Sequence, residues 1–185
     1  AGILSLQFSQ NLLKENKAFT LHLTDEHDLD GLPETAREAA ALTAQEQNKE
    51  GWIITLDYPS YLPFMTYSTR RELREQLYMA RNTECIHDNS ENNLDICKHL
   101  INLRCELAQL LGYETYADYV LKHRMASNIK NVYQLLDDLI TAYKPTAIEE
   151  REELIRLAPE LEGNDFELQE WDMTYYSHKL KLRKY

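Results

Sequence analysis

Apolar residues repeat at helical spacing in the stretch that follows Asn128. Asn is a favourable N-cap, because its side-chain oxygen accepts a hydrogen bond from a free backbone N–H of the first turn. The repeat runs through positions i, i+3, i+4, i+7, i+8 and i+11, which predicts an amphipathic helix with one face to bury. We expect Pro145 to kink or end this helix, and the charged stretch 149–153 to continue as a solvated helical face that closes at Gly163–Asn164. The members of the repeat are Val132, Leu135, Leu136, Leu139, Ile140 and Tyr143.

Helical patterns also fill the region just before this stretch. Residues 94–111 carry two adjacent apolar stripes, so we expect more than half of that helix surface to be buried. Thr115 followed by Asp118 forms a capping-box pattern that predicts the start of another helix. In the helix before 94–111, Arg71 and Glu75 lie at i and i+4 and are expected to pair on the outer face.

Extended structure is indicated only in the first third of the chain. Residues 19–23 and 63–68 alternate between apolar and polar side chains, and 52–57 is rich in β-branched and aromatic residues. The predicted fold is mainly α, a multi-helix bundle with one small β-hairpin or short sheet formed by these three segments. We expect a single helical domain or part-domain, with helices and short strands over 1–68 and a helical bundle over 69–185.

Charge argues against several classes of partner. Lys and Arg number 20 and Asp and Glu number 31, which gives a net charge of −11. A surface of that charge repels the phosphates of nucleic acids and of anionic membranes instead of releasing their counterions. We therefore expect neither nucleic acid nor membrane as a partner.

Cysteine usage bears on the compartment. Cys85, Cys97 and Cys105 are an odd number, and none has the two-residue spacing of a metal knuckle or a redox pair. We expect them to be buried as small hydrophobic residues in a reducing compartment, which points to the cytoplasm. A periplasmic or exported parent is the alternative, because the chain does not begin with Met and we expect it to be a segment of a larger protein.

None of the motifs that carry common chemistries occurs in this sequence. It has no His-Glu-x-x-His, no glycine-rich phosphate loop and no Gly-x-Ser-x-Gly elbow. His22, Glu26 and His27 form the nearest His and Glu cluster, but their spacing does not fit that zinc motif and a surface loop explains them better. We therefore predict no catalytic residue and no metal ligand in this chain.

One aromatic and acidic cluster is dense enough to form part of a binding groove. It consists of Trp171, Asp172, Tyr175 and Tyr176. An indole and phenol groups stack on and hydrogen-bond an extended peptide, although core packing is the more common role of such residues. Both interpretations, a groove lining and a packed core, stay open at this point.

Several stretches resemble one family of enzymes, in the same order along the chain. The most specific is LINLRCELAQLLGYETYADYVLKHRMASNIKNV, from Leu100 to Val132. Upstream lie Gly31-Leu32-Pro33-Glu34 and WIITLDYPSYLPFMTYS, and downstream Trp171-Asp172 precedes Tyr175-Tyr176. These stretches resemble the thimet oligopeptidase, oligopeptidase A and peptidyl-dipeptidase family of zinc metallopeptidases, over nearly the whole chain. Within it, Asp88-Asn89 slightly favours the peptidyl-dipeptidases.

The resemblance implies a role without catalysis for this segment. The family's zinc helix, third zinc ligand and assisting side chains all correspond to positions after Tyr185, so none of them maps onto this chain. The resemblance implies that the intact enzyme uses zinc to activate water for the hydrolysis of short peptides, which enter a channel between two mostly helical halves. This segment would bind no zinc, be inactive alone, and form part of the channel wall against the remainder of its own polypeptide, with Trp171, Asp172, Tyr175 and Tyr176 as candidate channel-lining residues.

A second class of function stays open. A helical protein-interaction domain without enzymatic activity would show the same amphipathic patterns and would offer an exposed groove to a partner helix.

Overall fold

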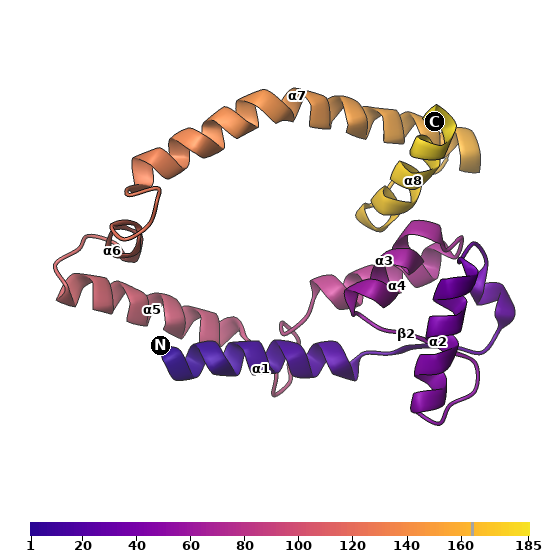
Figure 1. The fold of residues 1–185 in the computed structure, drawn as a ribbon, viewed down its shortest axis with the longest axis horizontal. Helices are drawn as coiled ribbons and strands as arrows, with labels where there is room; N and C mark the ends of the chain where they lie inside the picture. Colours follow the sequence, from indigo (N-terminus) through magenta and orange to yellow (C-terminus); the bar gives the residue numbers. More distant parts are fainter. Residues whose placement is uncertain (164) are drawn as a thin grey trace.

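The computed structural model describes residues 1–163 and 165–185. Helices dominate these residues, so the predicted mainly α fold is confirmed. In Figure 1 the chain traces an open loop: α1 lies along α5, α7 arcs across the top, and α8 returns to α3 and to the end of α7. The elements in chain order are α1 (Gly2–Ala18), β1 (Leu21–Leu23), η1 (Glu26–Leu29), α2 (Glu34–Glu46), β2 (Trp52–Ile54), α3 (Tyr58–Tyr67), α4 (Arg71–Asn82), α5 (Leu94–Leu110), α6 (Tyr116–Leu121), α7 (Ile129–Glu162), η2 (Glu170–Asp172) and α8 (Met173–Lys184).

The short sheet combines two of the three expected strands. β1 pairs antiparallel with β2, with Leu21 opposite Ile54 and Leu23 opposite Trp52. The inward-facing residues Leu21, Leu23 and Ile54 are buried, and α2 packs on β2. The strands expected within 19–23 and 52–57 are therefore present, although each is shorter than its segment.

The strand expected at 63–68 is wrong, because these residues belong almost entirely to α3. Pro59 lies in the first turn of this helix, where its missing N–H has no intrahelical partner to lose. Phe64 and Met65, which are neighbours in sequence, are both buried, which a half-buried strand cannot achieve. Packing of α3 between α2, α4 and α8 has overridden the local alternation.

We call residues 19–82 the N-terminal module, and they hold the main apolar core. Leu29, Leu56, Phe64 and Leu77 are at most 1% exposed within it. Gly31 lets the chain turn closely beneath α3: its φ is +88°, and a Cβ there would lie 2.2 Å from the carbonyl oxygen of Tyr67. The module is thus tightly packed from the loop before α2 to the end of α4.

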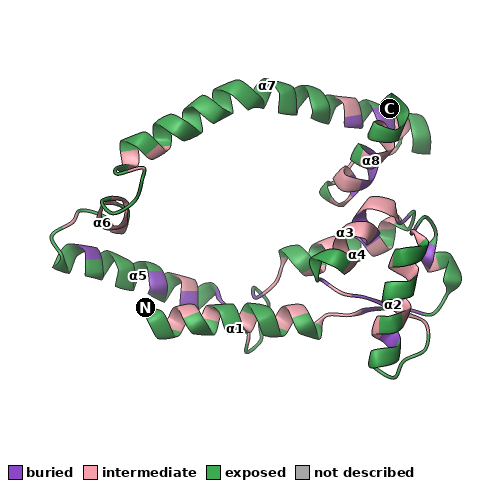
Figure 2. Cartoon of the chain, in the orientation of Figure 1, coloured by how far each residue is buried: buried purple, intermediate pink, exposed green. Residues whose placement is uncertain are grey.

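We call residues 94–148 the arm, which comprises α5, α6 and the first part of α7. Its caps form as predicted: Thr115 and Asp118 make a capping box, and Asn128 accepts a hydrogen bond from the N–H of Asn131 at 2.9 Å. The expected burial is absent, since α5 buries only Ile96, Leu100 and Ala108. Figure 2 shows that α7 is exposed over most of its length and that buried stretches on α5 are few.

One of the two outcomes expected at Pro145, the end of the helix, does not occur in α7. The helix runs through this proline without ending and spans 34 residues to Glu162, where Gly163 follows with a φ of +114°. A proline removes one hydrogen bond and crowds one carbonyl, and a long helix with intact bonds on both sides absorbs that loss by curving. Asn164, the other half of the predicted stop, lies outside the described residues.

Candidate functional site

The predicted aromatic and acidic cluster lies where η2 and the first turns of α8 pack against the rest of the chain. η2 contacts α4, and α8 contacts α3 and α7. Asp172 is 0%, Tyr175 7% and Tyr176 1% exposed, and Trp171 is half-buried. The structure therefore brings all four residues together in a mostly buried position.

Asp172 is held by two arginines of α4. Arg71 donates from Nε and Nη2 to the carboxylate at 3.1 and 2.8 Å, and Arg74 donates from Nη2 at 2.8 Å. The backbone N–H of Gln169 adds a further donor at 3.1 Å. Both carboxylate oxygens are thus occupied, so Asp172 is not free to act as a base or as a metal ligand.

The two guanidinium groups also stack on aromatic rings. Arg71 lies 4.4 Å from the ring centre of Phe166, and Arg74 lies 4.3 Å from that of Tyr175. The hydrogen bonds to Asp172 raise the pKa of Arg71, with burial opposing them. Arg74 is 1% exposed and also donates to the carbonyl oxygen of Ser68 at 2.7 Å. These contacts place a carboxylate and a carbonyl oxygen against a buried positive charge, while Nε of Arg74 is buried without a hydrogen-bond partner among the described residues.

Tyr176 connects the cluster to the end of α7. Its hydroxyl donates to Glu162 at 3.0 Å, and its ring stacks edge-on with Phe166 and Tyr175. Burial, followed by the bond to Glu162, raises the pKa of Tyr176 well above its ordinary value. The phenol therefore stays protonated at neutral pH, and the cluster fixes positions instead of transferring protons.

Sequence reasoning missed the arginines. It placed Arg71 in an exposed pair with Glu75, whereas the structure pairs Arg71 with Asp172 about a hundred positions away in the chain. The available signal was the i, i+3 spacing of Arg71 and Arg74, which puts two cations on the apolar side of α4 next to Leu77. Their partner could not be read from spacing, because it comes from a different part of the chain.

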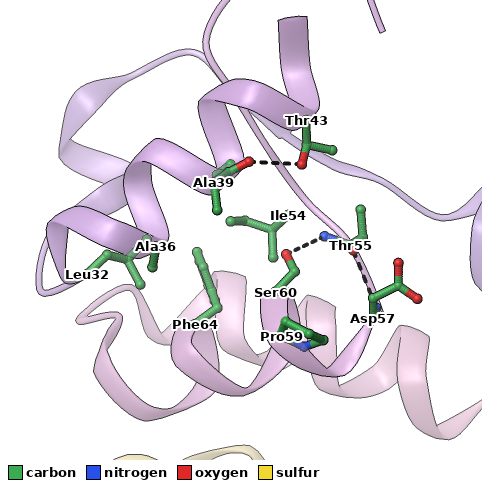
Figure 3. A pocket seen from close by; sticks show the side chains of 11 residues that line it. Leu32, Ala36, Ala39, Thr43, Ile54, Thr55, Asp57, Pro59, Ser60 and Phe64 are labelled. Carbon is green, nitrogen blue, oxygen red and sulfur yellow. Dashed lines mark hydrogen bonds between the residues drawn. The ribbon is translucent and has the colours of Figure 1, made fainter. Parts of the chain in front are cut away.

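A cavity of about 260 Å³ lies between α2, β2 and α3 in the N-terminal module. Figure 3 shows the hydroxyl of Ser60 accepting from the N–H of Thr55 at 3.0 Å, and the hydroxyl of Thr43 donating to the carbonyl of Ala39 at 2.9 Å. Neither hydroxyl has a basic side chain beside it among the lining residues. The cavity offers apolar volume but no activated nucleophile. It is lined by Leu32, Ala36, Ala39, Ala40, Thr43, Ile54, Thr55, Asp57, Pro59, Ser60 and Phe64.

The other candidates from the sequence do not assemble into a site. Nε2 of His22 lies 2.7 Å from the carbonyl oxygen of Glu50, and Nδ1 of His27 lies 3.8 Å from Oδ2 of Asp30. Over residues 1–163 and 165–185, no three His, Cys, Asp or Glu side chains are placed to hold a metal ion. In the same residues no helix is both long and apolar enough to cross a membrane.

The expectation of three buried cysteines is wrong for two of them. Cys85 is buried, Cys97 is half-buried and Cys105 is exposed, and all three are free thiols. Burial raises the pKa of Cys85 to about 12, so that thiol is not reactive. The other two lie on α5, whose apolar stripes are largely uncovered in this chain.

Comparison with known proteins points to one family. The sequence profile described as Peptidase family M3 matches residues 64–185. The chain is 40% identical to oligopeptidase A of Salmonella typhimurium over 97% of its own length and 27% of that protein. It is 34% identical to the organellar oligopeptidase A of Arabidopsis thaliana, over 98% of the chain and 24% of that protein.

Identity to dipeptidyl carboxypeptidase of Escherichia coli is 26%, over 100% of the chain and 27% of that protein. Because this is lower than the 40% identity to the Salmonella oligopeptidase A, the slight preference for the peptidyl-dipeptidases is not supported. The chain spans about a quarter of the length of the curated relatives it matches.

Proposed function

Because this chain belongs to Peptidase family M3, we propose that it is a non-catalytic helical segment of a zinc-dependent oligopeptidase that hydrolyses short peptides. The observation that carries the proposal is the family match over 64–185, which includes the specific stretch from Leu100 to Val132. The relatives whose names contain oligopeptidase A support the substrate class.

We assign the chemistry to the remainder of the polypeptide. The described residues offer no group of three His, Cys, Asp or Glu side chains that fits a zinc ion. In the intact enzyme, zinc would supply the activation of water. The segment contributes shape, and we expect it to be inactive on its own.

The proposed shape is part of a substrate channel wall. The segments on both sides of the arm are held in place: Asn93, just before α5, donates to the carbonyl of Phe8 at 3.1 Å, and Tyr176 of α8 donates to Glu162 at the end of α7. A wall of this kind would select unstructured peptides by size before any bond is broken. The buried ion pair of Asp172 would then hold the wall in position.

That Trp171, Asp172, Tyr175 and Tyr176 line the channel stays a prediction. Trp171 is the member with the most accessible surface, although its indole Nε1 is itself buried and has no hydrogen-bond partner among the described residues. The free thiols of Cys85, Cys97 and Cys105 are consistent with the cytoplasm as the proposed compartment.

The decisive experiment is hydrolysis of a ladder of peptides of increasing length by the full-length polypeptide, with and without a chelator. We expect cleavage of short peptides, loss of cleavage on chelation, and no cleavage of folded proteins. Absence of cleavage at every length would contradict the enzyme and favour the helical interaction domain.

The same ladder tests the channel-lining residues. In the full-length polypeptide, Tyr175→Phe together with Tyr176→Phe should change the preferred peptide length, and Tyr58→Phe on α3, outside the arm, is the control at an exposed tyrosine. Unchanged kinetics across the ladder for the double variant would remove these tyrosines from the channel.

A further inference from the structure

The first half of α7 carries an apolar stripe that no described residue covers. Leu135 is 60%, Leu139 43% and Ile140 56% exposed. The buried residues of this helix, Leu154, Leu157 and Ala158, all lie in its second half, next to α8. Two halves of one helix thus differ in whether their apolar side has a partner.

The stripe has the geometry of a helix-packing face. Its residues recur at the spacing of one helix side, whereas Gln134, Asp138 and Thr141 lie on the opposite side. On that side, the side-chain amide of Gln134 donates a hydrogen bond to Asp138 at 2.9 Å. These two polar side chains therefore need no other protein segment to form a hydrogen bond. A contiguous apolar face of this kind is rare on a free monomer and marks an interaction surface.

We propose that the stripe from Val132 to Tyr143 is the docking surface for an apolar helical face of the remaining polypeptide. The inference rests on the proposed function, in which this chain is one segment of a longer peptidase. The curated relatives contain about four times as much chain as the matched segment, so such a face has a source.

Charge disfavours a second copy as the occupant. Each copy carries a net charge of −11, and Asp137 precedes Leu139 and Ile140 of the stripe on α7. Pairing two such helices would bring like charges together along the contact. The other helices of the arm do not cover the stripe either, because α5 packs on α1 and the stripe residues of α7 remain exposed.

Hydrogen exchange tests the proposal directly. The backbone amides of 132–146 are followed by mass spectrometry in the full-length polypeptide and in the 185-residue chain. We expect these amides to exchange at least about 100-fold more slowly in the full-length polypeptide, since a docked helix opens far less often than an exposed one. Amides of α4 in the N-terminal module should exchange at similar rates in both and serve as the internal reference.

Three outcomes decide the matter. Slower exchange in the full-length polypeptide supports the docking. Equal exchange in both proteins overturns it, and so does protection in the 185-residue chain that rises with protein concentration, because a second copy is then the occupant. The readout needs no enzymatic activity, so a failed peptidase assay and a failed docking are distinguishable.

A pair of variants adds a second measurement. In the full-length polypeptide, Leu136→Glu places a charge in the stripe and should abolish the extra protection of 132–146. Thr141→Glu places the same charge on the opposite side of the helix and should preserve it. Equal effects of the two substitutions would contradict the docking.

Discussion

The N-terminal module and the arm use the same sequence pattern with opposite results. Leu77 of α4 and Leu136 of α7 both belong to apolar stripes at helical spacing, yet Leu77 is 0% and Leu136 46% exposed. The module surrounds its stripes with a sheet and three helices, whereas the arm extends away from it (Figure 2). Amphipathic spacing therefore identifies which side of a helix is apolar, but it does not identify what covers that side.

The largest expected effect concerns the ion pair that fixes α8 to the module. Asp172→Ala removes the partner of Arg74, which is 1% exposed, and leaves a buried charge without compensation. We expect a loss of about 3–5 kcal/mol in the free energy of unfolding, measured by urea denaturation of the 185-residue chain.

The control for this prediction is an exposed pair at the other end of α8. Nη1 of Arg183 lies 2.6 Å from Oε2 of Glu160, and the two side chains are 61% and 55% exposed. Glu160→Ala should change the free energy of unfolding by no more than about 1 kcal/mol. Similar losses for Asp172→Ala and Glu160→Ala would show that burial of the Asp172 pair contributes nothing.

The second effect compares the two leucines directly. In the 185-residue chain, Leu77→Ala creates a cavity in the module and should cost about 2–5 kcal/mol in urea denaturation. Leu136→Ala removes a side chain that is already in contact with water, so its cost should stay within about 0.5 kcal/mol.

A large loss for Leu136→Ala in the 185-residue chain would break the comparison between module and arm. In the full-length polypeptide the same substitution should become costly, because the stripe is then covered. A small cost of Leu136→Ala in the 185-residue chain and a large cost in the full-length polypeptide would together show that the rest of the polypeptide packs on Leu136.

The smallest effect appears at alkaline pH. Burial raises the pKa of Tyr176 in the folded chain, so above about pH 10 the unfolded chain loses this proton first and the free energy of unfolding falls as pH rises. Below that pH the contribution is fully present. In the Tyr176→Phe variant, the free energy of unfolding should therefore fall less steeply with pH above about pH 10. Urea denaturation at several pH values measures this.

The raised pKa of Cys85 produces a similar decline from lower pH. The contribution of Cys85 is the same in the Tyr176→Phe variant and in the unsubstituted chain, so it cancels when the two are compared. Parallel declines in the two proteins would mean that Tyr176 titrates normally in the folded chain.

Local signals in the sequence predicted the starts of α6 and α7. The capping box of Thr115 and Asp118 and the N-cap of Asn128 work within a few residues, so they form as predicted. The strand expected at 63–68 failed because alternation over five or six residues is weak evidence against the packing of α3 on three neighbouring elements.

The aromatic and acidic cluster was predicted only in part. Trp171, Asp172, Tyr175 and Tyr176 were recognised by their density, but the arginines that hold Asp172 were not. Arg71 and Arg74 precede Asp172 by about a hundred residues, and no periodicity connects positions so far apart.

The sequence by itself determined the mainly α fold, the helix caps, the acidic charge and the family resemblance, because each depends on residue types or on spacing within a few turns. Only the tertiary structure decided that Arg71 and Arg74 bind Asp172, that 63–67 is helical, and that the stripe of α7 stays uncovered in this chain. These features arise from contacts between distant segments, whose free energy depends on which surfaces meet and exclude water.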